Sequence, residues 1–378
     1  MPSSYAPKDA LALAEYRLQR AGAWLLHLPY WVFVALLSVT SVVHLGFVLP
    51  RDPVPQYAEW ASSWPSGANW DSSPLWLLVP RFLGITVGAP WIVLWVSLAV
   101  VTVPVAAWLA LRSLGDPAAR LFLTVIAITS IPFRILWGLG FYDQLFLLGG
   151  LILVLGGGKL CWVIGALLLS TSNAEMSLAA AVSSLLLALG LSSRRIFERS
   201  LVLLIASAFT GLVILLSQRG EGVGLGRWGA LPTYLMSSLE GNLTWLPMTM
   251  ASGYLSGWIV VTLLILSRPG LIRPALSLSA LVFLPLFMTL ITLDGSRVFV
   301  VTGSLAYLFG ARWLLARGRS CSESRNPRLS TEIVLIGGLL LAVATPAVNV
   351  RAYAGGVWPR PWGDFIYLLM DRGLAPLG

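Results

Sequence analysis

Long apolar runs alternate with short polar or charged connections through most of the chain. The runs predict about eleven membrane-spanning helices, because about 20 apolar residues cover the hydrocarbon core of a bilayer. The fold class is therefore an all-α polytopic membrane protein of 10–12 helices, with residues 1–378 as a single integral membrane domain. The expected spans are 30–49, 90–111, 119–137, 144–157, 159–172, 176–192, 200–217, 246–267, 275–293, 297–314 and 332–349.

The region between 144 and 192 departs from this regular pattern. Its apolar segments are short for a full crossing, and "GGG" at 156–158 and "STSNAE" at 170–175 interrupt them. An irregular backbone cannot face lipid, because its polar groups would lack hydrogen-bond partners there. The pattern therefore predicts short, broken or re-entrant helices that line a cavity.

Two further segments have a pattern typical of helices that lie on a membrane surface. The stretch "KDALALAEYRLQRAGAWLLHL" predicts an amphipathic helix within the N-terminal segment 1–28, which we expect to be retained. In the loop 50–89, the stretch "SSPLWLLVPRFLG" after Asp71 predicts a short surface helix that is capped by Ser72 or Ser73 and started by Pro74. An ordinary solvated loop with interfacial tryptophans is the alternative for this loop.

The composition supports a membrane protein and excludes several other classes. Of the 378 residues, 57% are hydrophobic and 11% are charged, whereas soluble domains carry roughly a quarter charged residues. The chain has two Cys and two His, so neither a disulfide framework nor a Cys/His metal site is expected. The net charge of +9 does not indicate nucleic-acid binding, since the positive-inside bias of a membrane protein accounts for its sign.

The loop arginines and lysines set the expected orientation. If the N-terminus is cytoplasmic, the inner loops collect most of the 25 basic residues, including the clusters "SSRRIFERS" and "RGRSCSESRNPR". The positive-inside rule favours this arrangement in a plasma membrane such as the bacterial inner membrane. The outer face then carries the loops 50–89 and 218–245 and the tail 350–378, whose aromatic residues are expected to anchor at the headgroups.

Ionisable residues gather at the ends of the spans on this outer face. Charged groups near hydrocarbon are costly to desolvate, so several at one depth indicate a functional site. Arg134 and Asp143 flank an aromatic connection. Asp294 and Arg297 share the turn between two spans. The candidate catalytic residues are Asp52, Asp71, Asp143, Glu175 and Asp294, and the candidate substrate-binding residues are Arg81, Arg134, Arg297, Trp137 and Tyr142.

Each of these features also has a purely structural interpretation. Arg134 would snorkel to the headgroups, and Asp294 with Arg297 would form a turn closed by a salt bridge. Asn173 would cap a helix that carries Glu175 in its first turn. A functional interpretation is favoured because arginine accompanies an acid in several hairpins on the same face.

The residue types indicate chemistry on a lipid-linked phosphate. Arginine forks suit phosphate or pyrophosphate, and carboxylates supply a general base or the ligands of a divalent cation such as Mg or Mn. Neither a P-loop nor a G-x-G-x-x-G that follows a strand is present, which disfavours ATP coupling and dinucleotide chemistry. A lipid-phosphate sugar donor would enter laterally from the bilayer, while a carboxylate deprotonates the attacking hydroxyl.

On these residues the chain resembles the polytopic glycosyltransferases of the GT-C type. Those enzymes carry an essential acidic residue in the first outer loop, followed by surface helices, and use a polyprenyl-phosphate sugar. Asp52 or Asp71 occupies that loop here, and the stretch 71–82 resembles its jutting helix. The chain also resembles the small bacterial polysaccharide polymerases that join lipid-linked repeat units. The resemblance implies cell-envelope or exopolysaccharide assembly, with a polyprenyl-phosphate-linked sugar and a glycan or lipid acceptor as partners.

Two other classes remain open. A transporter or flippase for a lipid-linked or small anionic substrate would suit the short segments in 144–192, and it predicts ionisable residues through the full depth of the bilayer. The sequence instead predicts a one-sided cluster, with few charges inside the spans in the inner half. A structural assembly subunit would use the outer charges as a docking rim.

Overall fold

The computed structural model of the chain describes residues 7–45, 73–85, 88–132, 143–218, 235–236, 239–292, 295–320, 331–344, 347–351 and 356–360. Helices make up most of the regular structure in these ranges, and a short strand pair follows the last helix. In chain order the elements are α1 (Pro7–His27), α2 (Tyr30–Leu45), α4 (Pro74–Phe82), α5 (Gly88–Leu114), α6 (Asp116–Ala127), α8 (Asp143–Leu155), α9 (Lys159–Ser172), α10 (Ala174–Leu191), α11 (Arg194–Gln218), α13 (Leu246–Tyr254), η1 (Leu255–Gly257), α14 (Trp258–Leu266), α15 (Ile272–Leu278), η2 (Ser279–Phe283), α16 (Leu284–Leu290), α17 (Gly295–Ser320), α18 (Thr331–Ala344), β1 (Ala347–Arg351) and β2 (Gly356–Arg360).

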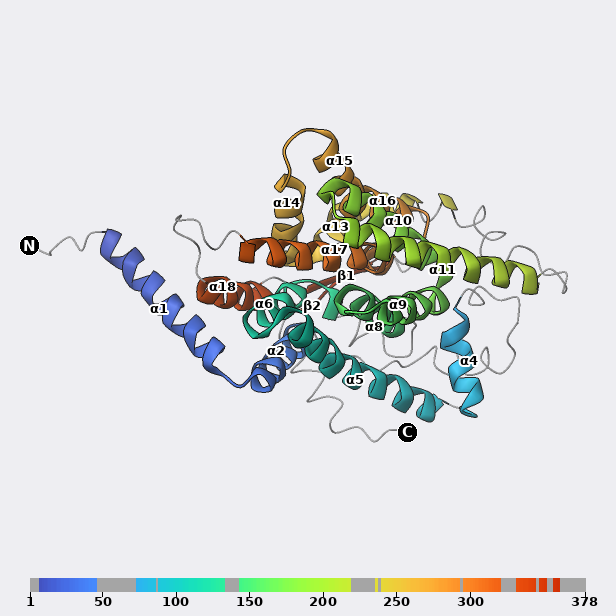
Figure 1. The fold of residues 1–378 in the computed structure, drawn as a ribbon, viewed down its shortest axis with the longest axis horizontal. Coiled ribbons are helices and arrows are strands. Elements are labelled where there is room, and N and C mark those ends of the chain that lie inside the picture. The colour runs from blue at the N-terminus through green and yellow to red at the C-terminus, as the bar shows by residue number, and fades with distance from the viewer. Residues whose placement is uncertain are drawn as a thin grey trace, which may run out of the picture.

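The helices pack into one bundle with α17 at its centre (Figure 1). α17 contacts α6, α8, α10, α13 and α16, and nearly all of its residues from Val298 to Ala311 are buried. A helix that is apolar on every side belongs inside such a bundle. α1 and α4 lie at opposite ends of the view in Figure 1.

Six helices in the described residues are long and apolar enough to cross a membrane, and the sharply bent pair α1–α2 makes a seventh if it counts as one span. Two of the six are the interrupted segments Leu246–Leu266 and Ile272–Leu290. α8, α9 and α18 are apolar too, but they belong to the shorter class of 10–17 residues. These lengths and compositions indicate a helical membrane protein. The described residues do not confirm eleven complete crossings.

The two interrupted segments are not the continuous spans that their hydropathy predicts. In the first, η1 separates α13 from α14, and Leu255 there adopts a positive φ of 49°. In the second, the π-helix η2 separates α15 from α16. The hydroxyl of Tyr254 at the first break donates to the carbonyl of Leu281 at the second (3.0 Å). A side-chain hydrogen bond of this kind gives a partner to a backbone carbonyl near a break in a helix. The pattern of apolar residues does not predict such a contact.

The short helices α8 and α9 form a close hairpin around the glycine run 156–158. Gly149 and Gly165 face each other at the crossing, where a Cβ on Gly165 would lie 2.8 Å from the Gly149 carbonyl oxygen. Small residues let helix backbones approach closely, which drives helix association in lipid. The break expected at 156–158 is confirmed. A second break falls at Asn173, whose backbone is extended.

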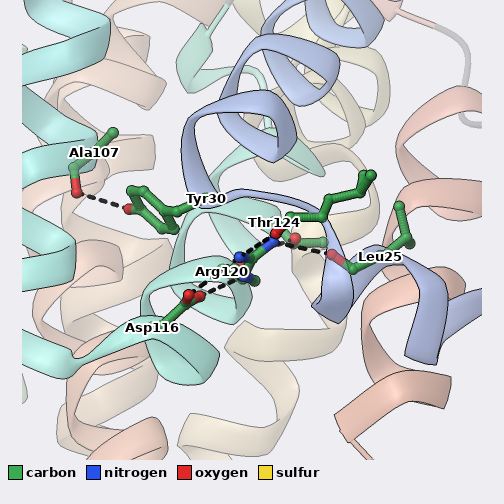
Figure 2. A network of polar contacts seen from close by, with 7 residues as sticks. Leu25, Tyr30, Ala107, Asp116, Arg120 and Thr124 are labelled. Carbon is green, nitrogen blue, oxygen red and sulfur yellow. Dashed lines mark hydrogen bonds and ion pairs between the residues drawn. The ribbon is translucent and has the colours of Figure 1, made fainter.

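Helices α1 and α2 meet at an elbow, bent by 116°, that Arg120 of α6 holds in place (Figure 2). The Arg120 guanidinium donates to the carbonyl oxygens of Leu25 (2.9 Å) and Leu28 (2.8 Å) and pairs with Asp116. A cation is favourable at the C-terminal end of a helix, where α1 leaves its last carbonyls unpaired. The helix expected in the N-terminal segment is therefore present, and it packs against α18.

The end of the described chain departs from the all-α expectation. α18 ends at Ala344, short of the boundary predicted at 349, and β1 pairs with β2 in an antiparallel hairpin. β1 packs against α13 and α17. Short apolar runs suit a helix or a strand equally, so their pattern does not decide between them. The described residues thus form a predominantly helical fold with one two-stranded sheet.

Candidate functional site

The first turns of α8 and α17 come together at one end of the bundle, which we call the Asp143 end, and the first turn of α10 lies beside the turns of α17 that follow. α17 packs against both other helices, and the Thr302 hydroxyl of α17 lies 3.8 Å from the Met176 sulfur of α10. Helix N-termini carry partial positive charge and unpaired N–H groups. The Asp143 end therefore favours anions, and it has Asp143 and Glu175 in the first turns of α8 and α10.

Asp143 and Arg297 form a buried, two-pronged ion pair at this end. Arg297 Nε lies 2.7 Å from Asp143 Oδ2, and Arg297 Nη2 lies 2.9 Å from Asp143 Oδ1. The Asp143 side chain is 1% exposed and that of Arg297 is 11% exposed. A forked arginine–carboxylate pair is strong in itself, but the cost of removing both charges from water offsets most of the gain. Such a pair inside a membrane bundle is a candidate for function.

Asn173 links α10 to the start of the short helix α4. Its Oδ1 accepts a hydrogen bond from the Met176 backbone N–H (2.8 Å), and its Nδ2 donates to the Ser73 hydroxyl (3.3 Å). Ser73 stands at the N-cap position of α4, ahead of Pro74, although its hydroxyl makes no capping bond. The interpretation of Asn173 as a helix cap is confirmed, and Glu175 lies half-buried in the turn that follows.

The structure brings Asp143 and Arg297 together and places two further candidates. Glu175 lies in the first turn of α10, which packs beside α17. Arg81 lies in the last turn of α4 and is exposed. In the part of the chain that the structure describes, no group of three His, Cys, Asp or Glu side chains is placed to hold a metal ion. The candidates that lie outside the described residues are Asp52, Asp71, Arg134, Trp137, Tyr142 and Asp294.

An apolar cavity of about 110 Å³ lies between α2, α5, α6, α8 and α17. The hydroxyls of Ser38 and Thr102, which line it, donate to the carbonyls of Val34 and Leu98 in their own helices. The walls therefore present mainly hydrocarbon, which suits an apolar group. No local signal in the sequence indicates this cavity, because its lining residues come from five separate helices.

The cavity runs along the same two helices that supply the ion pair. Leu147 and Leu151 line it from α8, one and two turns after Asp143. Leu308 lines it from α17, three turns after Arg297. The ion pair and the hydrocarbon-lined space therefore lie along the same two helices, α8 and α17.

At the opposite end of the bundle, which we call the Arg199 end, arginines are enclosed between the helix ends. Arg199 of α11 is 2% exposed and donates to the carbonyl oxygens of Leu153 (2.6 Å), Gly156 (2.8 Å) and Val154. Arg312 of α17 donates to the same Val154 oxygen. The free carbonyls at and just after the end of α8 accept the hydrogen bonds of both arginines.

Comparison with known protein families, with curated proteins and with solved structures finds no match to this chain. The class of protein therefore rests on the fold: a helical bundle in which the described residues form six to seven segments able to cross a membrane. The likeness to GT-C glycosyltransferases and polysaccharide polymerases stays a prediction from the sequence.

Proposed function

We propose that this protein is a membrane glycosyltransferase that takes its sugar from a polyprenyl phosphate on the outer face of the membrane, in cell-envelope or exopolysaccharide assembly. The observation that carries the proposal is the buried Asp143–Arg297 pair beside a cavity with apolar walls. A polyprenyl phosphate has the same division, with a charged phosphate at one end of a long hydrocarbon chain. The charged part of the site would therefore hold the phosphate, and its apolar part would hold the hydrocarbon chain.

The spacing of residues along two helices supports this match. Asp143, Leu147 and Leu151 stand four residues apart and so share one side of α8, over about 12 Å. Arg297 and Leu308 are three turns apart on α17, a distance of about 16 Å, and also share one side. A donor with its phosphate at Arg297 would therefore have its first prenyl units against Leu147 and Leu151.

In the proposed reaction, the donor phosphate replaces Asp143 as the partner of Arg297. The guanidinium stabilises the negative charge on the departing lipid phosphate, and the released Asp143 carboxylate accepts the proton of the attacking hydroxyl. The new bond joins the acceptor oxygen to the anomeric carbon. The bond between that carbon and the phosphate oxygen breaks with its electrons on the phosphate. The products are the glycosylated acceptor and a polyprenyl phosphate.

The proposal includes a topology for the whole chain. We place the N-terminus in the cytoplasm, with about eleven crossings or partial crossings and with α4 on the outer surface. The Asp143 end then faces outward, where a lipid-linked donor is present and a nucleotide sugar is not. Glu175 is the second candidate base among the described residues, and Asp52, Asp71 and Asp294 are candidates from the outer loops.

The test uses the purified full-length chain in liposomes that contain radiolabelled polyprenyl-phosphate hexoses or pentoses and a total membrane extract as acceptor. Turnover is measured as label that leaves the donor, and mass spectrometry follows the polyprenyl phosphate released. Asp143→Asn keeps the shape of the side chain but removes the base. We expect turnover to fall by about 10²–10⁴-fold, while the melting curve from tryptophan fluorescence shows that the variant is folded.

Asp116→Asn is the matched control. Asp116 also pairs with an arginine, Arg120, but it does so at the α1–α2 elbow. We expect this variant to turn over as fast as the unsubstituted chain. Normal turnover in Asp143→Asn, or an equal loss in both variants, would contradict the proposal.

A transporter or flippase for a lipid-linked or small anionic substrate is the second candidate function. It is favoured by one observation, the buried arginines at the Arg199 end, because a transport path needs ionisable groups beyond one face of the membrane. The same liposomes distinguish the two functions. A transporter moves the intact labelled donor across the bilayer, whereas a transferase releases polyprenyl phosphate from it.

A further inference from the structure

Arg199 places a fixed positive charge at the C-terminal end of α8. Its guanidinium donates to three carbonyl oxygens there and lies 4.8 Å from the centre of the Trp162 ring. Only 2% of the residue is exposed. Because the side chain is enclosed and held from several directions, its charge stays in one position.

Two more arginines add their charges to this position. Arg312 donates to the same Val154 oxygen as Arg199, so the two guanidinium groups lie only a few ångströms apart. Arg195, which is exposed in the first turn of α11, is close enough to repel both. No described Asp or Glu forms an ion pair with any of the three, and a helix C-terminus supplies only about half an elementary negative charge. The group keeps a net positive charge that attracts an anion.

A second group of arginines extends the positive surface along the end of α17. Arg268 and Arg317 both lie over the Trp313 ring, with guanidinium carbons 5.3 Å and 5.2 Å from its centre. Arg268 also donates to the Leu191 carbonyl at the end of α10 (2.9 Å). Burial, together with the charges of Arg317 and Arg273, lowers the pKa of the Arg268 guanidinium. Tryptophan and arginine at the ends of apolar helices are typical of the headgroup layer of a membrane.

Apolar side chains lead away from this charged group along the outside of the bundle. Phe197, Leu201 and Ile205 stand four residues apart on α11 and are exposed, and this stripe begins two residues after Arg195 in the sequence. Leu160 and Ile164 are exposed on α9, which packs against α11. Exposed apolar side chains on a membrane bundle are suited to contact with lipid acyl chains.

We propose that the Arg199 end binds the phosphate group of an anionic membrane lipid, held between Arg195 and Arg312 in front of the fixed charge of Arg199. Arginine forks match the oxygens of a phosphate in geometry. Basic pockets between membrane helices on the cytoplasmic side are suited to anionic headgroups, and the positive-inside rule assigns this end to that side. The acyl chains of the lipid lie along the exposed faces of α9 and α11.

The experiment measures the melting temperature of the full-length chain in phosphatidylcholine vesicles, with and without about a fifth of phosphatidylglycerol. We expect phosphatidylglycerol to raise the melting temperature, and native mass spectrometry to find it retained on the protein. Arg195→Gln and Arg312→Gln should each lower the apparent affinity for phosphatidylglycerol by about fivefold. Arg195 is exposed and makes no described hydrogen bond, so the first variant tests the proposal even if the second folds poorly.

Arg194→Gln is the matched control, since Arg194 stands next to Arg195 but is 92% exposed and paired with Glu198. It should keep the full effect of phosphatidylglycerol. An equal loss in Arg194→Gln would point to diffuse surface charge and overturn the proposal. The same follows if inorganic phosphate with phosphatidylcholine alone reproduces the stabilisation, or if phosphatidylglycerol has no effect on the unsubstituted chain.

Discussion

The two ends of the bundle each hold a buried guanidinium, but they satisfy it in different ways. At the Asp143 end, Arg297 meets a carboxylate through two of its nitrogens. At the other end, Arg199 meets backbone carbonyls, and no described carboxylate pairs with it. The first arrangement is electrically neutral, while the second keeps its charge. Hydrogen bonding and charge neutralisation are thus separate requirements for a buried arginine, and a protein can meet one without the other.

One helix, α8, accounts for both arrangements. Asp143 is its first residue, and its last carbonyls accept hydrogen bonds from Arg199 and Arg312. The helix dipole favours an acid at the N-terminus and cations at the C-terminus. The polarity of a single 13-residue helix therefore places a carboxylate at one end of the bundle and a positive cluster at the other.

The largest effect is expected from removing one partner of the neutral pair. Asp143→Ala removes the carboxylate that pairs with the buried Arg297, so we expect the free energy of unfolding to fall by about 3–5 kcal/mol. Titration with a denaturing detergent in mixed micelles, followed by tryptophan fluorescence, measures the change. The double variant Asp143→Leu/Arg297→Met removes both charges and should recover most of the loss. A double variant as unstable as the single one would show that charge pairing is not what the site requires.

A smaller loss is expected at the charged end. Arg199→Met should lower the free energy of unfolding by about 2–3 kcal/mol, because the carbonyls of Leu153 and Gly156 lose a charged donor. The substitution also removes repulsion from Arg312, which keeps the loss below that of Asp143→Ala. Arg199→Lys retains the charge without the fork and should recover only part. If Arg199→Lys restored the full free energy of unfolding, the positive charge alone, and not the forked hydrogen bonding, would stabilise the Arg199 end. Both ends would then depend on charge.

Arg120 provides an intermediate case, since it combines a carboxylate with backbone carbonyls (Figure 2). The Asp116 side chain is 47% exposed, so water weakens that pair and Arg120→Met should cost about 1–2 kcal/mol. We expect the distance between spin labels on α1 and α18 to become broadly distributed. Arg112→Met, at an exposed arginine stacked on Trp108 of α5, should leave that distance unchanged. A narrow distribution in Arg120→Met would show that packing against α18 alone holds the elbow.

The smallest effect is expected at the cap of α10. Asn173→Ala removes the acceptor of the Met176 N–H and should cost about 1 kcal/mol. Asn173→Ser keeps a capping oxygen, so it should lower the free energy of unfolding by only a few tenths of a kcal/mol. Hydrogen exchange at the Met176 amide measures the difference. Similar exchange in the two variants would show that the link to Ser73, rather than the cap, is what stabilises this turn.

Several elements agree closely with the pattern of apolar residues. The expected segment 159–172 is α9, and the segments expected to start at 144 and 297 begin within two residues of those positions, at Asp143 and Gly295. Each boundary has a local cause: a glycine run, a helix cap or a charged turn. A short helix is also present after Asp71, as α4. Local signals of this kind act on a few residues at a time and are visible in the chain itself.

The candidate site was predictable only as a set of residues. In the sequence, the nearest oppositely charged candidate to Asp143 is Arg134 in the same hairpin, and the nearest to Arg297 is Asp294 in the same turn. The structure pairs Asp143 with Arg297, 154 residues away. The cavity beside them draws its walls from five helices. Neither the pairing nor the cavity has a local signal, because both depend on which helices lie side by side.

The amino-acid sequence by itself determined that this is a helical membrane protein and where most of its helices begin and end. The reason is that the thickness of the bilayer sets the length of each apolar run independently of the others. Only the tertiary structure decided that Arg297 meets Asp143, that Arg199 lies enclosed at the end of α8, and that the segments around Leu255 and Leu281 are broken. The physical reason is that a buried charge or an open carbonyl must be satisfied by whichever group packs against it. That group comes from a distant part of the chain.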